Sequence, residues 1–172
     1  MGGQGIVLLG TILGTAAVVH ERKFATQAPS YGTETRGSPA KSQIVISSEK
    51  IGYPEIRKAS ILVAMTQAAL SCHAEMLDKQ ATVIVDSDLV KTIPSTLGHV
   101  WKVPATRLSE EKLGSRNYAN MVMFGAMVKV RGLVSRKAAK DAIASTVPEH
   151  TVGKNLMAFE LGVKAAETTT AS

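Results

Sequence analysis

The stretch Ile61-Leu-Val-Ala-Met65 is wholly apolar, and Thr82-Val-Ile-Val-Asp86 is apolar until its final acid. Short, continuous apolar runs rich in β-branched residues are typical of strands covered on both faces by helices. Residues 68–77, which lie between the two runs, suit a crossover helix. A strand–helix–strand unit of this kind predicts a parallel sheet and therefore an α/β fold.

Further elements extend this unit in both directions. Upstream, a Gly-rich turn opens a helix that ends near Val19; a long connection over 23–41 and a short strand over 43–47 follow. Downstream, a strand over 99–103 is stopped by Pro104, and the remainder is helical. The expected helices cover 106–113, 117–130 with Gly132 as its stop, a segment with Ser135 as its N-cap, and 155–166.

Length and composition indicate one folded domain. The chain has 172 residues, 45% of them hydrophobic and 20% charged, with a net charge of +6. These values are those of a globular protein, which excludes a disordered or collagen-like chain. We expect a single domain over 1–166 and an unpacked tail over 167–172.

Cysteine and histidine usage excludes several classes of site. Cys72 is the single cysteine, so the chain has no internal disulfide and a reducing cytoplasm is the simplest setting. An iron–sulfur cluster needs about four thiolates, so this chain cannot hold one alone. The four histidines show no zinc-site spacing, and we expect no metal site. The apolar run over 6–19 falls short of the roughly 20 residues that span a membrane.

The Gly-rich turn Gly2-Gly-Gln-Gly5 is the first candidate site. Free backbone N–H groups at a helix start bind phosphate groups, but a tight structural turn explains the same residues. A dinucleotide fingerprint would need G-x-G-x-x-G and an acid at a second strand tip. The spacing differs here, and Glu21 lies at the expected helix end.

Three further places carry polar groups that could bind a ligand. The loop around Tyr31, Glu34 and Arg36 offers a guanidinium for an anion, although Glu34 and Arg36 could instead pair with each other. Asp86-Ser-Asp88 follows a buried strand, where capping of a helix is the favoured interpretation. Asn120 lies in an apolar helix and is expected to tie a neighbouring loop or another subunit.

A basic stretch occurs between residues 116 and 140, which hold six basic side chains and no acid. It could bind nucleic acid, but the chain lacks aromatic residues interleaved with the charges. We therefore expect a solvated face or a surface for an acidic partner protein, with no nucleic acid and no membrane as partner. No nucleophile elbow, P-loop or paired catalytic carboxylates are evident, so we expect no catalytic residue and a binding or assembly module.

Taken in order, several motifs resemble a known family. They are Gly2-Gly-Gln-Gly-Ile6, the loop Gln27…Ser30-Tyr-Gly-x-Glu-x-Arg-Gly37, Ile61-Leu-Val-Ala-Met-Thr-Gln67, Ile84-Val-Asp-Ser-Asp-Leu-Val90, Val103-Pro-Ala-Thr106, and Ala119-Asn-Met-Val-Met123 through Gly132-Leu-Val-Ser135. The series resembles the gamma subunit of 2-oxoacid:ferredoxin oxidoreductases, most of all the 2-oxoglutarate branch. The resemblance covers about residues 2–166.

The resemblance implies a Rossmann-like three-layer α/β/α sandwich with a mostly parallel sheet and a helical C-terminal part. It implies a cytoplasmic complex with alpha and beta subunits, with or without a delta subunit. Such a complex decarboxylates a 2-oxoacid, transfers the acyl group to coenzyme A and reduces ferredoxin. Thiamine diphosphate, Mg and [4Fe-4S] clusters are expected in sister subunits, and none is expected on this chain alone.

Site residues follow from the resemblance by position. Two segments are expected together at a subunit boundary near the coenzyme A channel, where they help to enclose that cofactor. The expected residues are Gly2, Gly3, Gln4 and Gly5 of the Gly-rich turn, and Tyr31, Glu34, Arg36 and Gly37 of the loop. Ser38-Pro39 departs from the family pattern and is expected to stiffen the loop tip.

The N-terminal end also departs from the family pattern, in which a strand and a glycine precede the Gly-rich turn. Met1 stands where that glycine is expected. Either the strand is absent, or the start has been set too late. Without the strand, a central slot of the sheet would expose unpaired backbone and apolar surface, and the isolated chain would be prone to self-association.

Other functions stay open at this stage. Within the family, the chain could serve a pyruvate or a branched-chain 2-oxoacid enzyme instead. Outside it, a free-standing nucleotide-binding regulatory module would use the Gly-rich turn, and a basic nucleic-acid-binding protein would use the stretch over 116–140. The preferred 2-oxoacid and the subunit stoichiometry are not encoded in recognisable motifs.

Overall fold

A three-stranded parallel sheet forms one half of the molecule. The computed structural model describes residues 5–30, 40–53 and 56–169. The strands are β3 (Ala59–Ala64), β4 (Leu77–Asp86) and β5 (His99–Val103), adjacent in that order. The crossover from β3 to β4 contains the short helix α2 (Gln67–His73), which Thr66 caps by accepting a hydrogen bond from the Ala69 N–H. The predicted parallel sheet is confirmed.

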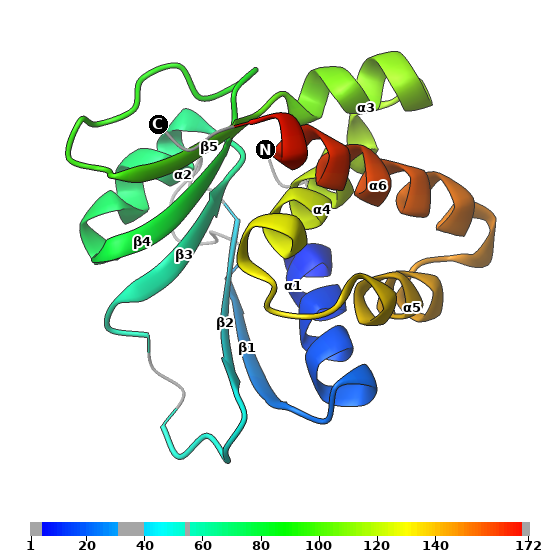
Figure 1. The fold of residues 1–172 in the computed structure, drawn as a ribbon, viewed down its shortest axis with the longest axis horizontal. Coiled ribbons are helices and arrows are strands. Elements are labelled where there is room, and N and C mark those ends of the chain that lie inside the picture. Colours follow the sequence, from blue (N-terminus) through cyan, green and yellow to red (C-terminus); the bar gives the residue numbers. More distant parts are fainter. Residues whose placement is uncertain (1–4, 31–39, 54–55, 170–172) are drawn as a thin grey trace.

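Helices cover both faces of this sheet, as its continuous apolar strands predict. Val83 and Val85 pack with Leu70 of α2, whereas Ile84 packs with the larger group of helices. That group is α1 (Ile6–Thr15), α4 (Ala119–Arg131), α5 (Arg136–Thr146) and α6 (Val152–Thr168). Figure 1 shows α2 and this group on opposite sides of the strands.

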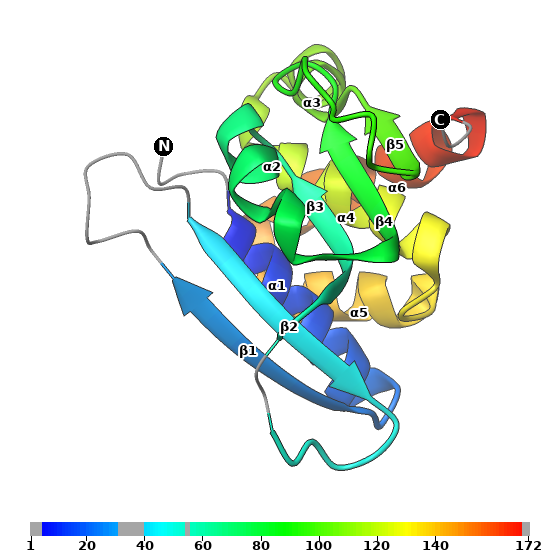
Figure 2. The ribbon, with the colours of Figure 1, turned by 90° about the vertical axis from the view of Figure 1, so that its left-hand side faces the viewer.

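An antiparallel hairpin forms a separate second sheet. Its strands are β1 (Phe24–Ser30) and β2 (Lys41–Ser47), paired from Phe24↔Ser47 to Ser30↔Lys41. The hairpin and the parallel sheet lie side by side, with α1 behind the hairpin (Figure 2). The predicted strand over 43–47 is confirmed, but the long connection over 23–41 was wrong in its first part, because residues 24–30 form β1. Mixed polarity and Pro29 disguise this strand.

The helical part contains the most tightly packed contact. α4 and α6 cross where two glycines remove the side chains between the backbones. A Cβ on Gly125 would lie 1.9 Å from the Phe159 carbonyl oxygen, and one on Gly162 would lie 1.8 Å from that of Val122. Phe124 and Phe159 pack beside this crossing with ring centroids 5.5 Å apart. The crossing therefore depends on glycine at both positions.

Several predicted boundaries move by a few residues. The crossover helix ends at His73, a short 3-10 turn (Ala74–Met76) follows, and β4 already begins at Leu77. Helix α3 (Ala105–Leu113) and α4 agree with the prediction, and Gly114 and Gly132 end them in left-handed conformations. α6 continues to Thr168, so the expected tail over 167–172 was wrong for its first two residues. Helix α1 continues into a π-helical turn, Ala16–His20.

Candidate functional site

Gly5, the last residue of the Gly-rich turn, begins the candidate site. Its φ of 61° is left-handed, and it precedes the first residue of α1. Its carbonyl oxygen accepts hydrogen bonds from the Leu9 N–H at 2.9 Å and from Asn120 Nδ2 at 3.1 Å. A Cβ here would lie 2.3 Å from Asn120 Nδ2, so both the backbone and the space require glycine. Gly2, Gly3 and Gln4 lie outside the described residues.

Asn120 ties this turn to the core. Its side chain is buried in α4, donates to Gly5 and accepts from the Met121 N–H at 2.9 Å. A buried amide needs such partners, because an unsatisfied polar group costs about 1–3 kcal/mol. The prediction that Asn120 ties a neighbouring segment is confirmed, and that segment is the entrance to α1.

Gln27 is a second link, one that sequence reasoning did not identify as an anchor. From β1 its Nε2 donates to the Val7 carbonyl oxygen at 3.1 Å and to Ser42 Oγ at 2.9 Å. Gly10 of α1 packs against the same group, since a Cβ there would lie 2.2 Å from Ser42 Oγ. The absence of a side chain at Gly10 therefore lets α1 lie close to the hairpin. The sequence did contain one signal for this hairpin, namely the loop with Gly32 and Gly37 that precedes the predicted strand over 43–47.

The second candidate segment is the loop that joins β1 to β2. Tyr31, Glu34, Arg36 and Gly37 lie outside the described residues. The two ends of the loop are held by the last pair of the hairpin, Ser30↔Lys41. Ala40, which follows the loop, and Gly5, which ends the Gly-rich turn, line the same cavity.

This cavity is an apolar slot of about 770 Å³ between β2 and β3, bounded by α1 and α2. We call it the β2–β3 slot. Lys41, Lys58 and His73 add polar groups to its largely apolar lining. Burial lowers the pKa of His73 below its ordinary value, and the positive charge of Lys41 lowers it further. Lys58 donates from Nζ to the Glu75 carbonyl oxygen at 2.9 Å.

The acids after β4 serve as caps. Asp86 is fully buried and accepts from Thr106 Oγ1 at 2.6 Å and from the Thr106 N–H at 3.1 Å, while Asp88 accepts from the Arg107 N–H at 2.7 Å. Both carboxylates thus accept hydrogen bonds from N–H groups at the start of α3, which have no partner within the helix itself. Burial raises the pKa of Asp86, although its hydrogen bonds partly offset this. The capping interpretation is confirmed.

Glu21 is likewise a structural group. It lies between the π-helical turn and β1, pairs with Lys23 Nζ at 2.8 Å and accepts from the Ser135 N–H at the start of α5. Burial raises the pKa of Glu21, but these two partners outweigh it and the net shift is downward. The carboxylate therefore holds α5 against the end of the first helix.

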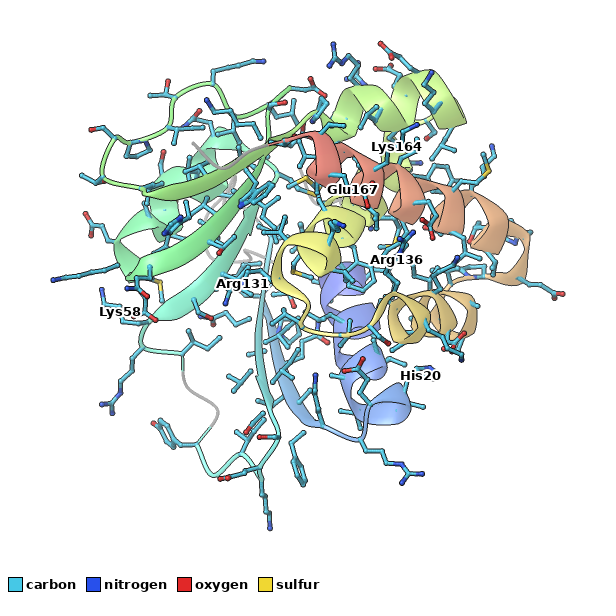
Figure 3. The ribbon with its side chains drawn as sticks, in the orientation of Figure 1. His20, Lys58, Arg131, Arg136, Lys164 and Glu167 are labelled. Carbon is cyan, nitrogen blue, oxygen red and sulfur yellow. The ribbon has the colours of Figure 1, made fainter. Side chains whose placement is uncertain are left out.

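The six basic side chains over 116–140 have partners on the protein. Five pair with carboxylates: Arg116 with Glu110, Lys129 with Glu167, Arg136 and Lys140 with Glu160, and Lys137 with Asp141. Figure 3 shows Arg136 and Glu167 among the helices and Arg131 beside the strands. Arg131 donates to Thr82 Oγ1 at 3.1 Å instead. The positive stretch of the sequence is thus largely neutralised in space.

Two further features are absent from residues 5–30, 40–53 and 56–169. No group of three or more His, Cys, Asp or Glu side chains is placed to hold a metal ion. No helix in the described part of the chain is long and apolar enough to cross a membrane.

Comparison with known proteins gives a consistent picture. A family model for pyruvate ferredoxin/flavodoxin oxidoreductase matches residues 1–165. The 2-oxoglutarate synthase subunit KorC of Methanothermobacter marburgensis is 42% identical over 94% of this chain and 90% of its own length. The gamma subunit of a keto/oxoacid ferredoxin oxidoreductase from Geobacter sulfurreducens superimposes with a TM-score of 0.87, at 36% identity over 96% of this chain and 94% of that chain.

A third relative shares the fold. The 2-oxoglutarate:ferredoxin oxidoreductase of Magnetococcus marinus, solved with 2-oxoglutarate, coenzyme A and succinyl-CoA bound, superimposes with a TM-score of 0.86 at 20% identity. The match covers 99% of this chain but 30% of that one. In that protein the same fold therefore forms one part of a longer polypeptide.

Proposed function

This chain belongs to the pyruvate ferredoxin/flavodoxin oxidoreductase family and is a gamma-type subunit of a 2-oxoacid:ferredoxin oxidoreductase, and on that premise we propose that its complex oxidises 2-oxoglutarate. The observation that supports 2-oxoglutarate as the substrate is the 42% identity to a 2-oxoglutarate synthase subunit, over 94% of this chain and 90% of that one. In this reaction 2-oxoglutarate, coenzyme A and two oxidised ferredoxins give succinyl-CoA, CO₂, one proton and two reduced ferredoxins.

The chemistry of this reaction is assigned to sister subunits. A cluster needs about four thiolates, and this chain has a single cysteine, which is exposed on α2. Two acids that its sequence places near candidate sites, Asp86 and Glu21, are engaged in a helix cap and an ion pair. We therefore assign thiamine diphosphate, Mg and the [4Fe-4S] clusters to the alpha, beta and any delta subunits. The exposed free thiol suits a reducing cytoplasm.

The role proposed for this chain is to help assemble the complex and to enclose coenzyme A. Gly5 of the turn and Ala40, which follows the loop over 31–39, line the same cavity beside α1. Main-chain N–H groups at a helix start and an Arg side chain are both suited to the phosphates of that cofactor. We propose that the turn (Gly2, Gly3, Gln4, Gly5) and the loop (Tyr31, Glu34, Arg36, Gly37) act together there.

Purification of the complex through a tag on this subunit tests the first proposal. The complex should reduce ferredoxin with 2-oxoglutarate and coenzyme A faster than with pyruvate or 2-oxoisovalerate, and the isolated chain should be inactive. Faster turnover of either other 2-oxoacid would reassign the substrate. Activity of the chain alone would overturn the subunit role.

Arg36→Ala tests the second proposal in the intact complex. We expect either a higher KM for coenzyme A, with the KM for 2-oxoglutarate unchanged, or a weaker association of this subunit. Lys137→Ala is the matched control, because it removes a cation that is 86% exposed on α5, a different element. If both variants assemble and turn over like the parent complex, Arg36 has no role in binding coenzyme A or in assembly.

A further inference from the structure

The side of α6 that faces away from α4 carries a shallow hollow. α6 lies between α3 and α5 (Figure 1), and it buries Phe159 and Gly162 on the side of α4. A helix turns by about 100° per residue, so Met157, Leu161 and Lys164 lie on the opposite side. The hollow has a volume of about 500 Å³, and α3, α5 and α6 all contribute to its lining. We call this hollow, which lies between Lys112 of α3, Lys140 of α5 and Met157 of α6, the α6 groove.

The floor of the α6 groove is apolar. It is formed by Leu156, Met157 and Leu161, three side chains of α6. Leu156 and Leu161 are partly buried against the core, whereas Met157 is 57% exposed. A single exposed apolar side chain on a surface is ordinary, but three that converge on one hollow are typical of a surface that contacts another protein.

The rim of the α6 groove is positively charged. Lys112, Lys140 and Lys164 stand on three different helices, and Glu160 is the single acid among the described residues that line the groove. Glu160 already pairs with Lys140, at 3.0 Å, and with Arg136 of α5. Lys112 and Lys164 are exposed and leave the groove with an excess of positive charge. An apolar floor inside a basic rim favours a partner that presents apolar side chains flanked by carboxylates.

A second copy of this chain and an extended peptide strand fit the groove poorly. Two copies that met through this groove would place lysines against lysines, because a symmetric pair uses the same patch on both subunits. An extended strand needs a strand edge for its backbone groups, and the groove is lined by helices alone.

An amphipathic helix satisfies its own backbone and meets both conditions of the groove. It can place apolar side chains on the floor at every third or fourth position, with acids on either side. The seven residues from Met157 to Lys164 extend about 10 Å along α6, which corresponds to about two turns of a partner helix.

We propose that the α6 groove binds an acidic amphipathic helix of a sister subunit. The apolar face of that helix packs on Met157 and Leu161, and its carboxylates pair with Lys112 and Lys164. This inference rests on the role of the chain as a subunit of a larger complex. It is independent of the 2-oxoacid and of the residues assigned to coenzyme A.

Photo-crosslinking in the purified complex tests the identity of the partner. The photoreactive amino acid p-benzoylphenylalanine replaces Met157, and mass spectrometry identifies the peptides joined to it after irradiation. We expect one sister-subunit segment with apolar residues at helical spacing and Asp or Glu beside them. The same amino acid in place of Lys79, which is exposed on β4, is the control and should not capture that segment. Capture of a second copy, capture of a segment without acids, or no capture overturns the proposal.

Charge removal tests the role of the rim. The double substitution Lys112→Gln and Lys164→Gln removes two charges but keeps long side chains that favour a helix. We expect the dissociation constant of this subunit from the complex to rise on the order of tenfold at low salt, and by less at high salt, because salt screens exposed charges. Lys137→Gln is the matched control, since Lys137 is exposed on α5 and does not line the groove.

Mass photometry of the complex at increasing dilution measures this constant. An equal dissociation constant for the double variant and the parent overturns the proposal, and so does an equal rise in the control. Failure of the parent chain to join any complex would instead overturn its role as a subunit. The two failures are therefore distinguishable.

Discussion

The α4–α6 crossing and the β2–β3 slot differ strongly in how closely their residues pack. At the crossing, the helix backbones approach so closely that the Cβ of an alanine has no space, and Phe124 and Phe159 are fully buried beside it. At the slot, every residue of β2 is only partly buried and about 770 Å³ is left between two strands. The difference shows that the helices pack closely against one another, whereas the hairpin leaves a cavity beside the parallel sheet.

The same contrast appears along a single strand. The last six residues of β4 are buried, while β3, its neighbour, is buried only at Ala64. β4 has a strand on each side and helices on both faces, and β3 has β4 on one side and the slot on the other. Local sequence does not cause this difference, since both strands are apolar.

Substitution of Gly162 should have the largest effect on the free energy of unfolding, because it acts directly on the α4–α6 crossing. In Gly162→Ala the new Cβ meets the Val122 carbonyl oxygen, a backbone atom that cannot move aside, so α4 and α6 must separate. We expect a loss of about 3 kcal/mol or more in the free energy of unfolding, measured by urea denaturation. Gly153→Ala on the same helix is the control, because nothing lies within 4 Å of its Cβ. An equal, small effect of both substitutions would show that the crossing is not rigid.

Asn120→Ala should have the next largest effect, because it removes the link between the two regions. The Gly5 carbonyl oxygen loses its Asn120 donor, and the Met121 N–H loses its acceptor. We expect a loss of about 2 kcal/mol. Proteolysis near the N-terminal end should also become faster, which a change in α4 alone would not produce. Unchanged proteolysis would argue that Gly5 is held by other contacts.

Gly10→Ala tests how easily the side chains between α1 and the hairpin rearrange. The new Cβ would meet Ser42 Oγ and Gln27 Nε2, which are side-chain atoms that can rotate away. We expect a loss of about 1 kcal/mol, since broken hydrogen bonds are partly offset by the helix propensity of alanine. Gly14→Ala, in the same helix and with open space at its Cβ, should be neutral or stabilising. A loss as large as that at Gly162 would mean that the hairpin is packed as rigidly as the crossing.

The pH dependence that His73 gives to the free energy of unfolding should be the smallest of these effects. Its folded pKa lies below the ordinary value of 6.5, because burial and Lys41 disfavour the charged form. The stability contributed by neutral His73 is therefore full above pH 6.5 and is lost as the pH falls through the lowered folded pKa. His73→Gln should flatten this part of the urea-unfolding profile between pH 7 and pH 5. His99→Gln, at an exposed position of β5, should leave it unchanged.

Much of the fold could be predicted from the sequence, because its signals are local. The apolar runs at 61–65 and 82–86 indicated strands of a covered parallel sheet, and Gly132 marked the end of a helix. β1 was missed because Pro29 and mixed polarity hide the strand, and because its pairing with β2 is not visible in the local sequence. For the candidate site, the order of motifs indicated the segments, and Asn120 was expected as a tie. The link through Gln27 could not be predicted, because it depends on the register between β1 and β2.

The sequence by itself determined the class of most elements, with β1 as an exception, together with the family and the lack of cluster-forming thiolates, since composition, periodicity and motif order are properties of the chain alone. Only the tertiary structure decided that Gly125 and Gly162 face each other, that Asn120 holds Gly5, and that two strand edges border an apolar slot. These features join residues that are far apart along the chain. Their energies depend on distances between backbones, and no local pattern of residues records those distances.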